Sequence, residues 1–91
     1  MENQNTYKYI TGAATTVFAG NETKRVILSA INVNKVLTGT LVVKAGTTTI
    51  GTLAASTPIG EYWYSKNGVE IEDLQIVNAS AEDVTVFYRN I

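Results

Sequence analysis

The acidic residues between positions 70 and 73 come closest to a catalytic arrangement in this chain. Glu70, Glu72 and Asp73 form its only acidic cluster. Two carboxylates at positions i and i+2 of a strand lie about 7 Å apart on one face, a spacing that resembles the carboxylate pair of a glycosidase. Such chemistry also needs a concave pocket that desolvates one carboxyl, which a strand in so small a domain seldom builds. We therefore interpret the cluster as a solvated outer face, with a catalytic pair and a cation site as weaker alternatives.

The residue types that are missing narrow the chemistry further. The chain has no cysteine and no histidine. Thiolate nucleophiles, imidazole bases, disulfides and the zinc sites built from these ligands are therefore excluded. We expect no enzymatic activity, no catalytic residues, no cofactor and no metal.

Charge and hydropathy indicate which classes of partner, nucleic acid or membrane, the chain is suited to bind. Seven basic and eight acidic residues are scattered along the chain, which leaves no basic stripe for a nucleic acid. The first ten residues, MENQNTYKYI, lack the apolar core of a signal peptide, and the longest apolar stretch, 26–31, is short and interrupted by Ser29. We expect no nucleic-acid partner, no membrane association and synthesis in the cytoplasm.

Aromatic side chains provide the second candidate site. Tyr62, Trp63 and Tyr64 follow one another, in a chain with five tyrosines, two phenylalanines and one tryptophan. Exposed aromatic rings stack on sugar rings or bases, so these three residues suggest a carbohydrate-binding platform. Because this aromatic content is ordinary for a β domain, core packing is the favoured interpretation, ahead of a protein interface and of ligand stacking.

The elements that must position these residues are β-strands. Threonine, valine and isoleucine make up about a third of the chain, and these β-branched side chains favour sheet over helix. One proline and seven glycines separate segments of strand length. The sequence predicts an all-β fold, with a polar N-terminal arm over residues 1–5 and a single small β-sandwich or jelly-roll-like barrel of about seven or eight antiparallel strands over residues 6–91. The expected strands cover residues 6–10, 15–18, 24–33, 39–45, 48–54, 61–66, 69–78 and 84–90.

The dipeptide Asn67-Gly68 gives the clearest turn signal. It separates two expected strands and suits a two-residue type I′ hairpin turn. With that turn, Trp63 pairs with Glu72 across the hairpin.

The apolar pattern changes phase beyond this turn. Apolar side chains occupy odd positions up to Ile71 and even positions from Leu74. One extra residue would produce this change, so the pattern predicts a β-bulge near residues 72–73.

Several expected strands are apolar on both faces, which a sandwich with solvated outer faces does not require. The segment 24–33 alternates two apolar sets: Val26, Leu28 and Ala30 on one face, and Ile27, Ile31 and Val33 on the other. A chain this short buries only about 60–65% of its surface on its own. We therefore expect a second subunit or a larger assembly to cover the outer apolar residues, and the N-terminal arm to extend onto a neighbour. The predicted interface residues are Asn3, Asn5, Tyr7, Ile27, Ile31, Trp63 and Phe87.

Three stretches in the last 55 residues carry a family resemblance. They read GTLVVKAG at 39–46, GVEIEDLQI at 68–76 and AEDVTVFY at 81–88. Together they resemble small β-sandwich virion structural proteins of tailed bacteriophages.

The resemblance implies a non-enzymatic structural role and supplies no catalytic residues. It implies a capsid decoration or cement protein that forms a symmetric homo-oligomer, for example a trimer, and binds the major capsid protein in the virion. Three alternatives stay open: a phage neck or tail component, a carbohydrate-binding module that uses Tyr62, Trp63 and Tyr64, and a small phage-encoded inhibitor of a host protein.

Overall fold

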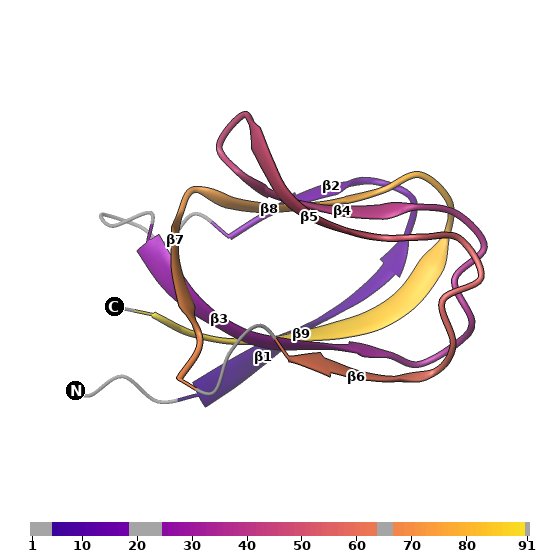
Figure 1. The fold of residues 1–91 in the computed structure, drawn as a ribbon, viewed down its shortest axis with the longest axis horizontal. Coiled ribbons are helices and arrows are strands. Elements are labelled where there is room, and N and C mark those ends of the chain that lie inside the picture. Colours follow the sequence, from indigo (N-terminus) through magenta and orange to yellow (C-terminus); the bar gives the residue numbers. More distant parts are fainter. Residues whose placement is uncertain (1–4, 19–24, 64–66, 91) are drawn as a thin grey trace.

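The computed structural model describes residues 5–18, 25–63 and 67–90. Within these ranges the chain forms two antiparallel sheets that face each other across one core (Figure 1). The predicted all-β sandwich is confirmed. The described ranges contain no helix long and apolar enough to span a membrane. Their nine strands are β1 (Asn5–Gly12), β2 (Thr15–Val17), β3 (Arg25–Val33), β4 (Leu41–Ala45), β5 (Thr48–Leu53), β6 (Gly60–Trp63), β7 (Val69–Glu72), β8 (Leu74–Asn78) and β9 (Glu82–Asn90).

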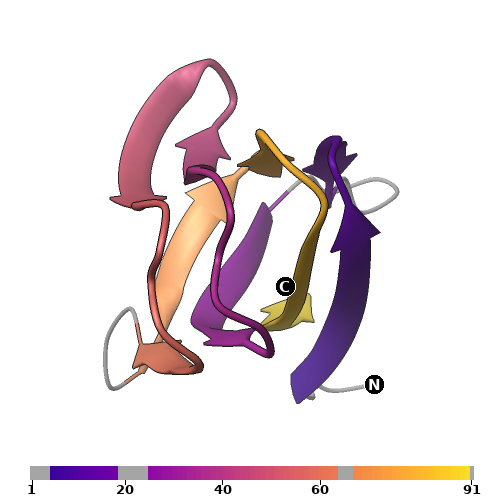
Figure 2. The same ribbon diagram turned by 90° about the vertical axis from the view of Figure 1, so that its right-hand side faces the viewer.

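The two sheets differ in strand length. Sheet A, the lower sheet in Figure 1, has the order β1-β9-β3-β6, and β7 also pairs with β3. Sheet B, the upper sheet, has the order β2-β8-β4-β5. Figure 2 views the sandwich from the end at which residues 34–40 connect β3 to β4 and residues 54–59 connect β5 to β6. Sheet A contains the three longest strands of the described residues, so it presents the longer outer face.

The core forms where the inward side chains of both sheets meet. Strand alternation sends every second residue inward, and here most of those residues are branched aliphatics. Burial of this apolar surface is the main contribution to folding of a chain without disulfides. The buried core residues are Ile10, Phe18, Val26, Leu28, Ile31, Val33, Leu37, Leu41, Val43, Ile71, Leu74, Ile76, Val84 and Val86.

The predicted hairpin at Asn67-Gly68 was wrong. β6 and β7 do not pair with each other, because both pair with β3, one after the other along the same edge. Trp63 lies opposite Ala30, and not opposite Glu72 as predicted. Gly68 has a φ of 86°, and a Cβ at this position would lie 2.4 Å from Cγ2 of Ile27. The glycine therefore permits a close approach to β3 where the sequence suggested a hairpin turn.

The predicted change of phase near residues 72–73 has a different cause from the one expected. Asp73 has a φ of 58° and stands between β7 of sheet A and β8 of sheet B. The chain thus changes sheets at Asp73, so that Ile71 and Leu74 both point into the core. The expected strand 69–78 is two strands, one in each sheet.

The assignment of Ile31 to an outer apolar face was also wrong. The register of β3 against β9 shifts between Leu28 and Ala30, so Ser29 is an extra residue in β3. This β-bulge reverses the alternation beyond it and turns Ile31 and Val33 into the core. Ile31 is fully buried, so it does not belong to the outer face that a partner could contact.

Candidate interaction surface

Aromatic side chains form a row across the outer face of sheet A. Tyr7 of β1 lies opposite Phe87 of β9, Phe87 lies opposite Ala30 of β3, and Ala30 lies opposite Trp63 of β6. Residues paired across antiparallel strands point to the same face of a sheet. We call Tyr7, Phe87 and Trp63 the aromatic row. Tyr7 and Trp63 are each 64% exposed, and Phe87 is partly exposed.

The position of the row follows from strand alternation. Ile10 and Val86 point into the core, so Tyr7 and Phe87, each an odd number of positions away, point outward. Ala30 is fully buried although it does not belong to the core cluster. Its small side chain lies between Phe87 and Trp63, which leaves the larger rings at the surface.

A polar network borders the aromatic row on the side toward the β3–β4 loop. The side-chain nitrogen Nδ2 of Asn32 donates to Oδ1 of Asn34 at 2.5 Å. Nδ2 of Asn34 donates to Oδ1 of Asp83 at 3.1 Å and to Oγ1 of Thr85 at 3.2 Å. The hydroxyl of Tyr9 bonds to the Asp83 carboxylate, and this hydrogen bond raises the pKa of Tyr9. We call Asn32, Asn34, Asp83 and Thr85 the polar network, and it fixes hydrogen-bonding groups beside the rings.

On its other side the row is bordered by residues 67–68, which precede β7. Nη2 of Arg89 donates to the carbonyl oxygen of Asn67 at 3.1 Å. Gly68 packs against Ile27, which is partly buried on the same outer face. The open part of this face therefore extends from the aromatic row to the polar network.

Two residues of the acidic cluster, Glu70 and Glu72, lie on the same face, on β7. Glu70 and Glu72 are both exposed, as a solvated face requires. The Glu70 carboxylate accepts a hydrogen bond from the Arg25 guanidinium, and exposed ion pairs of this kind stabilise a fold by at most about 1 kcal/mol. Within the described ranges no group of three acidic, histidine or cysteine side chains could hold a metal ion.

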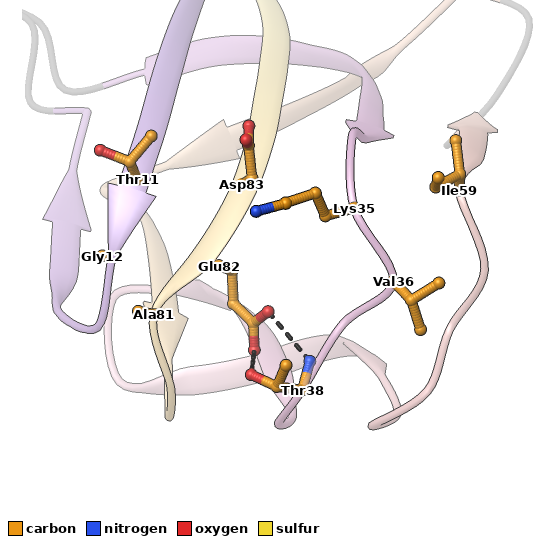
Figure 3. A pocket seen from close by; sticks show the side chains of 9 residues that line it. All are labelled: Thr11, Gly12, Lys35, Val36, Thr38, Ile59, Ala81, Glu82 and Asp83. Carbon is orange, nitrogen blue, oxygen red and sulfur yellow. Dashed lines mark hydrogen bonds between the residues drawn. The ribbon is translucent and has the colours of Figure 1, made fainter.

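A hollow of about 590 Å³ opens at the loop end of the sandwich (Figure 3). Glu82 in its wall is only 6% exposed. Its carboxylate accepts hydrogen bonds from the amide nitrogens of Thr38 at 3.0 Å and Gly39 at 2.8 Å, and from the Thr38 hydroxyl at 3.3 Å. Glu82 thus anchors the β3–β4 loop to β9, a role that sequence reasoning missed because nothing near Glu82 distinguishes it from the other acidic residues. The hollow is lined by Thr11, Gly12, Lys35, Val36, Thr38, Ile59, Ala81, Glu82 and Asp83.

The structure brings together most of the predicted interface residues that it describes. Tyr7, Ile27, Trp63 and Phe87 come from four strands and share the outer face of sheet A. Asn5 pairs with Arg89 at the start of β1. Asn3 lies outside the described residues, so the extension of the N-terminal arm onto a neighbour stays a prediction.

The predicted carbohydrate platform of three consecutive aromatics does not form as expected. Tyr62 packs against the core and donates its hydroxyl to the carbonyl oxygen of Pro58 at 2.7 Å. Trp63 points to the opposite face, as strand alternation dictates. Tyr64 lies outside the described residues.

Comparisons of this chain with protein-family models, with curated proteins and with solved structures give no match. We therefore infer function from the outer face of sheet A and from the sequence patterns.

Proposed function

We propose that this protein is a non-enzymatic structural protein that associates with other proteins through the outer face of sheet A. The observation that carries the proposal is the aromatic row, whose two outer members are each 64% exposed. Protein interfaces are enriched in tyrosine, tryptophan and phenylalanine, and their strongest contacts are most often tyrosine, tryptophan and arginine. A surface with this composition fits a protein partner.

The energetics favour association over solvation of these rings. Burial of the exposed part of Tyr7 and Trp63 would contribute about 2–3 kcal/mol each. Both side chains stand on strands, so association costs little further ordering of the backbone. A small number of rigid aromatic anchors then supplies most of the binding free energy.

The more specific proposal is a capsid decoration protein of a tailed bacteriophage. It is supported by the three sequence stretches that resemble small virion proteins, which correspond to β4, to β7 with β8, and to β9. A decoration protein occupies a repeating shell in many copies as a symmetric oligomer, and one compact association face per chain suits the formation of such an oligomer. A neck or tail component would use the same face in fewer copies.

The copy number of this chain in purified particles tests the proposal. Quantitative mass spectrometry against the major shell protein should give hundreds of copies per particle. About a dozen copies would contradict shell decoration and assign the chain to the neck or tail. Absence from the particles would overturn a virion role altogether.

A carbohydrate-binding function is the second candidate, because the polar network lies directly beside the aromatic row. A sugar ring could stack on Trp63 while its hydroxyl groups bond to Asn32 or Asp83. Titration of a glycan panel while Trp63 fluorescence is recorded tests this function, since Trp63 is the only tryptophan. A saturable change that is lost in Asn32→Ala would support it, and an unchanged spectrum with every glycan would exclude it.

A further inference from the structure

We propose that the outer face of sheet A binds a second copy of this chain about a two-fold axis parallel to the strands. In this arrangement β1 of each copy lies over β6 and β7 of the other. The inference rests on the proposed association through this face and names its partner. It follows from the charges, the order of side chains and the area of the face.

Charge is distributed unevenly across the face. β6 and β7 carry Glu61, Glu70 and Glu72 and contain no basic residue. The outer side chains of β1 are uncharged, because its only charged residue, Lys8, points toward the ring of Phe18 at 6.0 Å. Rotation about an axis parallel to the strands reverses the strand order, so the acidic edge of one copy faces the hydroxyl-bearing edge of the other.

A two-fold axis across the strands gives a less favourable contact. It places β6 and β7 of one copy over the same two strands of the other. Glu70 of one copy would then lie over Glu61 of the other, because these two residues stand on opposite sides of the aromatic row. Like charges brought together in this way repel each other, although the Arg25 guanidinium pairs with Glu70 and offsets part of this repulsion. The same axis also places Phe87 over Phe87 of the second copy, so that large side chains meet at the centre of the aromatic row. The arrangement parallel to the strands is therefore preferred.

The order of side chains in the aromatic row supports the same axis. From β1 to β6 the row reads Tyr7, Phe87, Ala30 and Trp63. In reversed order, Trp63 of one copy lies over Tyr7 of the second copy, and Phe87 lies over the short side chain of Ala30. The most exposed rings meet each other, and the row presents a large side chain to a small one at its centre.

The area of the face is sufficient for a specific dimer. Figure 1 looks along the shortest axis and shows the sheets one above the other, so each outer face lies within the 37 and 19 Å extents of the molecule. Their product is about 700 Å², and a standard interface takes about 800 Å² from each partner. A second copy would therefore cover most of the face.

Sedimentation equilibrium tests whether the dimer forms. The wild-type chain should show twice its 9.8 kDa mass. Trp63→Ala and Tyr7→Ala should each weaken dimerisation at least about tenfold, as expected for central aromatic contacts, while near-unchanged unfolding curves show that both variants fold. The matched control is Ile59→Ala, since Ile59 is 63% exposed but lies at the loop end. A monomer at all concentrations, a trimer, or equal effects of all three variants would overturn the proposal.

Disulfide trapping tests the orientation, and the absence of native cysteine makes it specific. Within one chain Tyr7 and Trp63 are three strand spacings apart, about 14 Å, which is too far for an intramolecular disulfide. The double variant Tyr7→Cys with Trp63→Cys should therefore oxidise to a covalent dimer. If Tyr7→Cys alone crosslinks as efficiently as the double variant, the axis crosses the strands and the proposed orientation is wrong.

The outcomes separate this inference from the proposed function. A monomeric chain that is still present in hundreds of copies per particle would overturn the dimer and leave the decoration role intact. A trapped dimer that is absent from particles would support the dimer and overturn the virion role.

Discussion

The outer faces of the two sheets are built from different kinds of side chain. Both stand on antiparallel strands over one core, and both are open to solvent in the single chain. The face of sheet A carries the aromatic row, with Tyr7 and Trp63 mostly exposed. The described outward residues of sheet B are mostly threonine and valine with a few long polar side chains, and none of them is aromatic. They include Thr15, Val17, Val42, Lys44, Thr49, Thr52, Gln75 and Val77.

This difference shows that exposed aromatic rings are not needed to build an outer face of this sandwich. Threonine and valine satisfy the pleated backbone of sheet B. We therefore propose that Tyr7 and Trp63 serve association, which their exposure favours.

The largest expected effect concerns β3 and tests which of its side chains point into the core. We expect Ile31→Ala to lower the free energy of unfolding by about 2–5 kcal/mol, because it empties part of the core. Ile27→Ala, on the outer face of the same strand, should cost less, since Ile27 is only partly buried. Urea unfolding measures both. Equal losses, or a larger loss for Ile27→Ala, would contradict the bulge at Ser29.

A second test concerns the close contact beside β3. A methyl group at position 68 would meet Ile27 Cγ2 at 2.4 Å, in addition to the strain of a positive φ. Gly12→Ala is the matched control, because its φ is also positive but no atom lies within 4 Å of the added Cβ. We expect Gly68→Ala to cost about 1–3 kcal/mol more than Gly12→Ala in thermal or urea unfolding. Equal costs would show that the contact with Ile27 is absent in solution.

A third test replaces the exposed aromatic residues of sheet A with threonine, which is common on the outer face of sheet B. We expect the double variant Tyr7→Thr with Trp63→Thr to change the free energy of unfolding of the monomer by about 1 kcal/mol or less, because threonine suits an exposed strand position. The same variant should lose self-association. A loss of more than about 3 kcal/mol in urea unfolding of the monomer would assign the two rings to folding.

The smallest effect concerns Tyr9 at alkaline pH. Its hydrogen bond to Asp83 raises the pKa of Tyr9 above its ordinary value of 10.0. The folded state therefore retains this proton longer than the unfolded chain, so the contribution to stability is present below pH 10 and is lost as pH rises through the folded pKa. Titration of the tyrosines by ultraviolet absorbance should show one phenol moving to lower pH in Asp83→Asn. An unchanged titration curve would exclude the Tyr9 to Asp83 bond.

The sequence predicts the features that depend on local chemistry. Its β-branched composition predicted the all-β fold, and the strand expected over residues 39–45 contains β4. Tyr7, Ile27, Trp63 and Phe87 were selected from separate strands, and the structure places them on one face.

The features that depend on a pairing partner could not be predicted locally. Asn67-Gly68 has the composition of a hairpin turn, but β3 offers a longer edge to which β6 and β7 both pair. The bulge at Ser29 is defined only by the register against β9, and it decides whether Ile31 points inward. The role of Glu82 depends on a loop more than 40 positions away in the chain.

The central claim is that association covers the aromatic row, and acrylamide quenching of Trp63 tests it most directly because Trp63 is the only tryptophan. The free chain at low concentration should show strong quenching, since Trp63 is 64% exposed. Quenching should fall steeply in the associated state, whether that is a concentrated solution or a purified particle, and Ile59→Ala should behave as the wild type does. Equal quenching of the free and associated chain would contradict association through the outer face of sheet A.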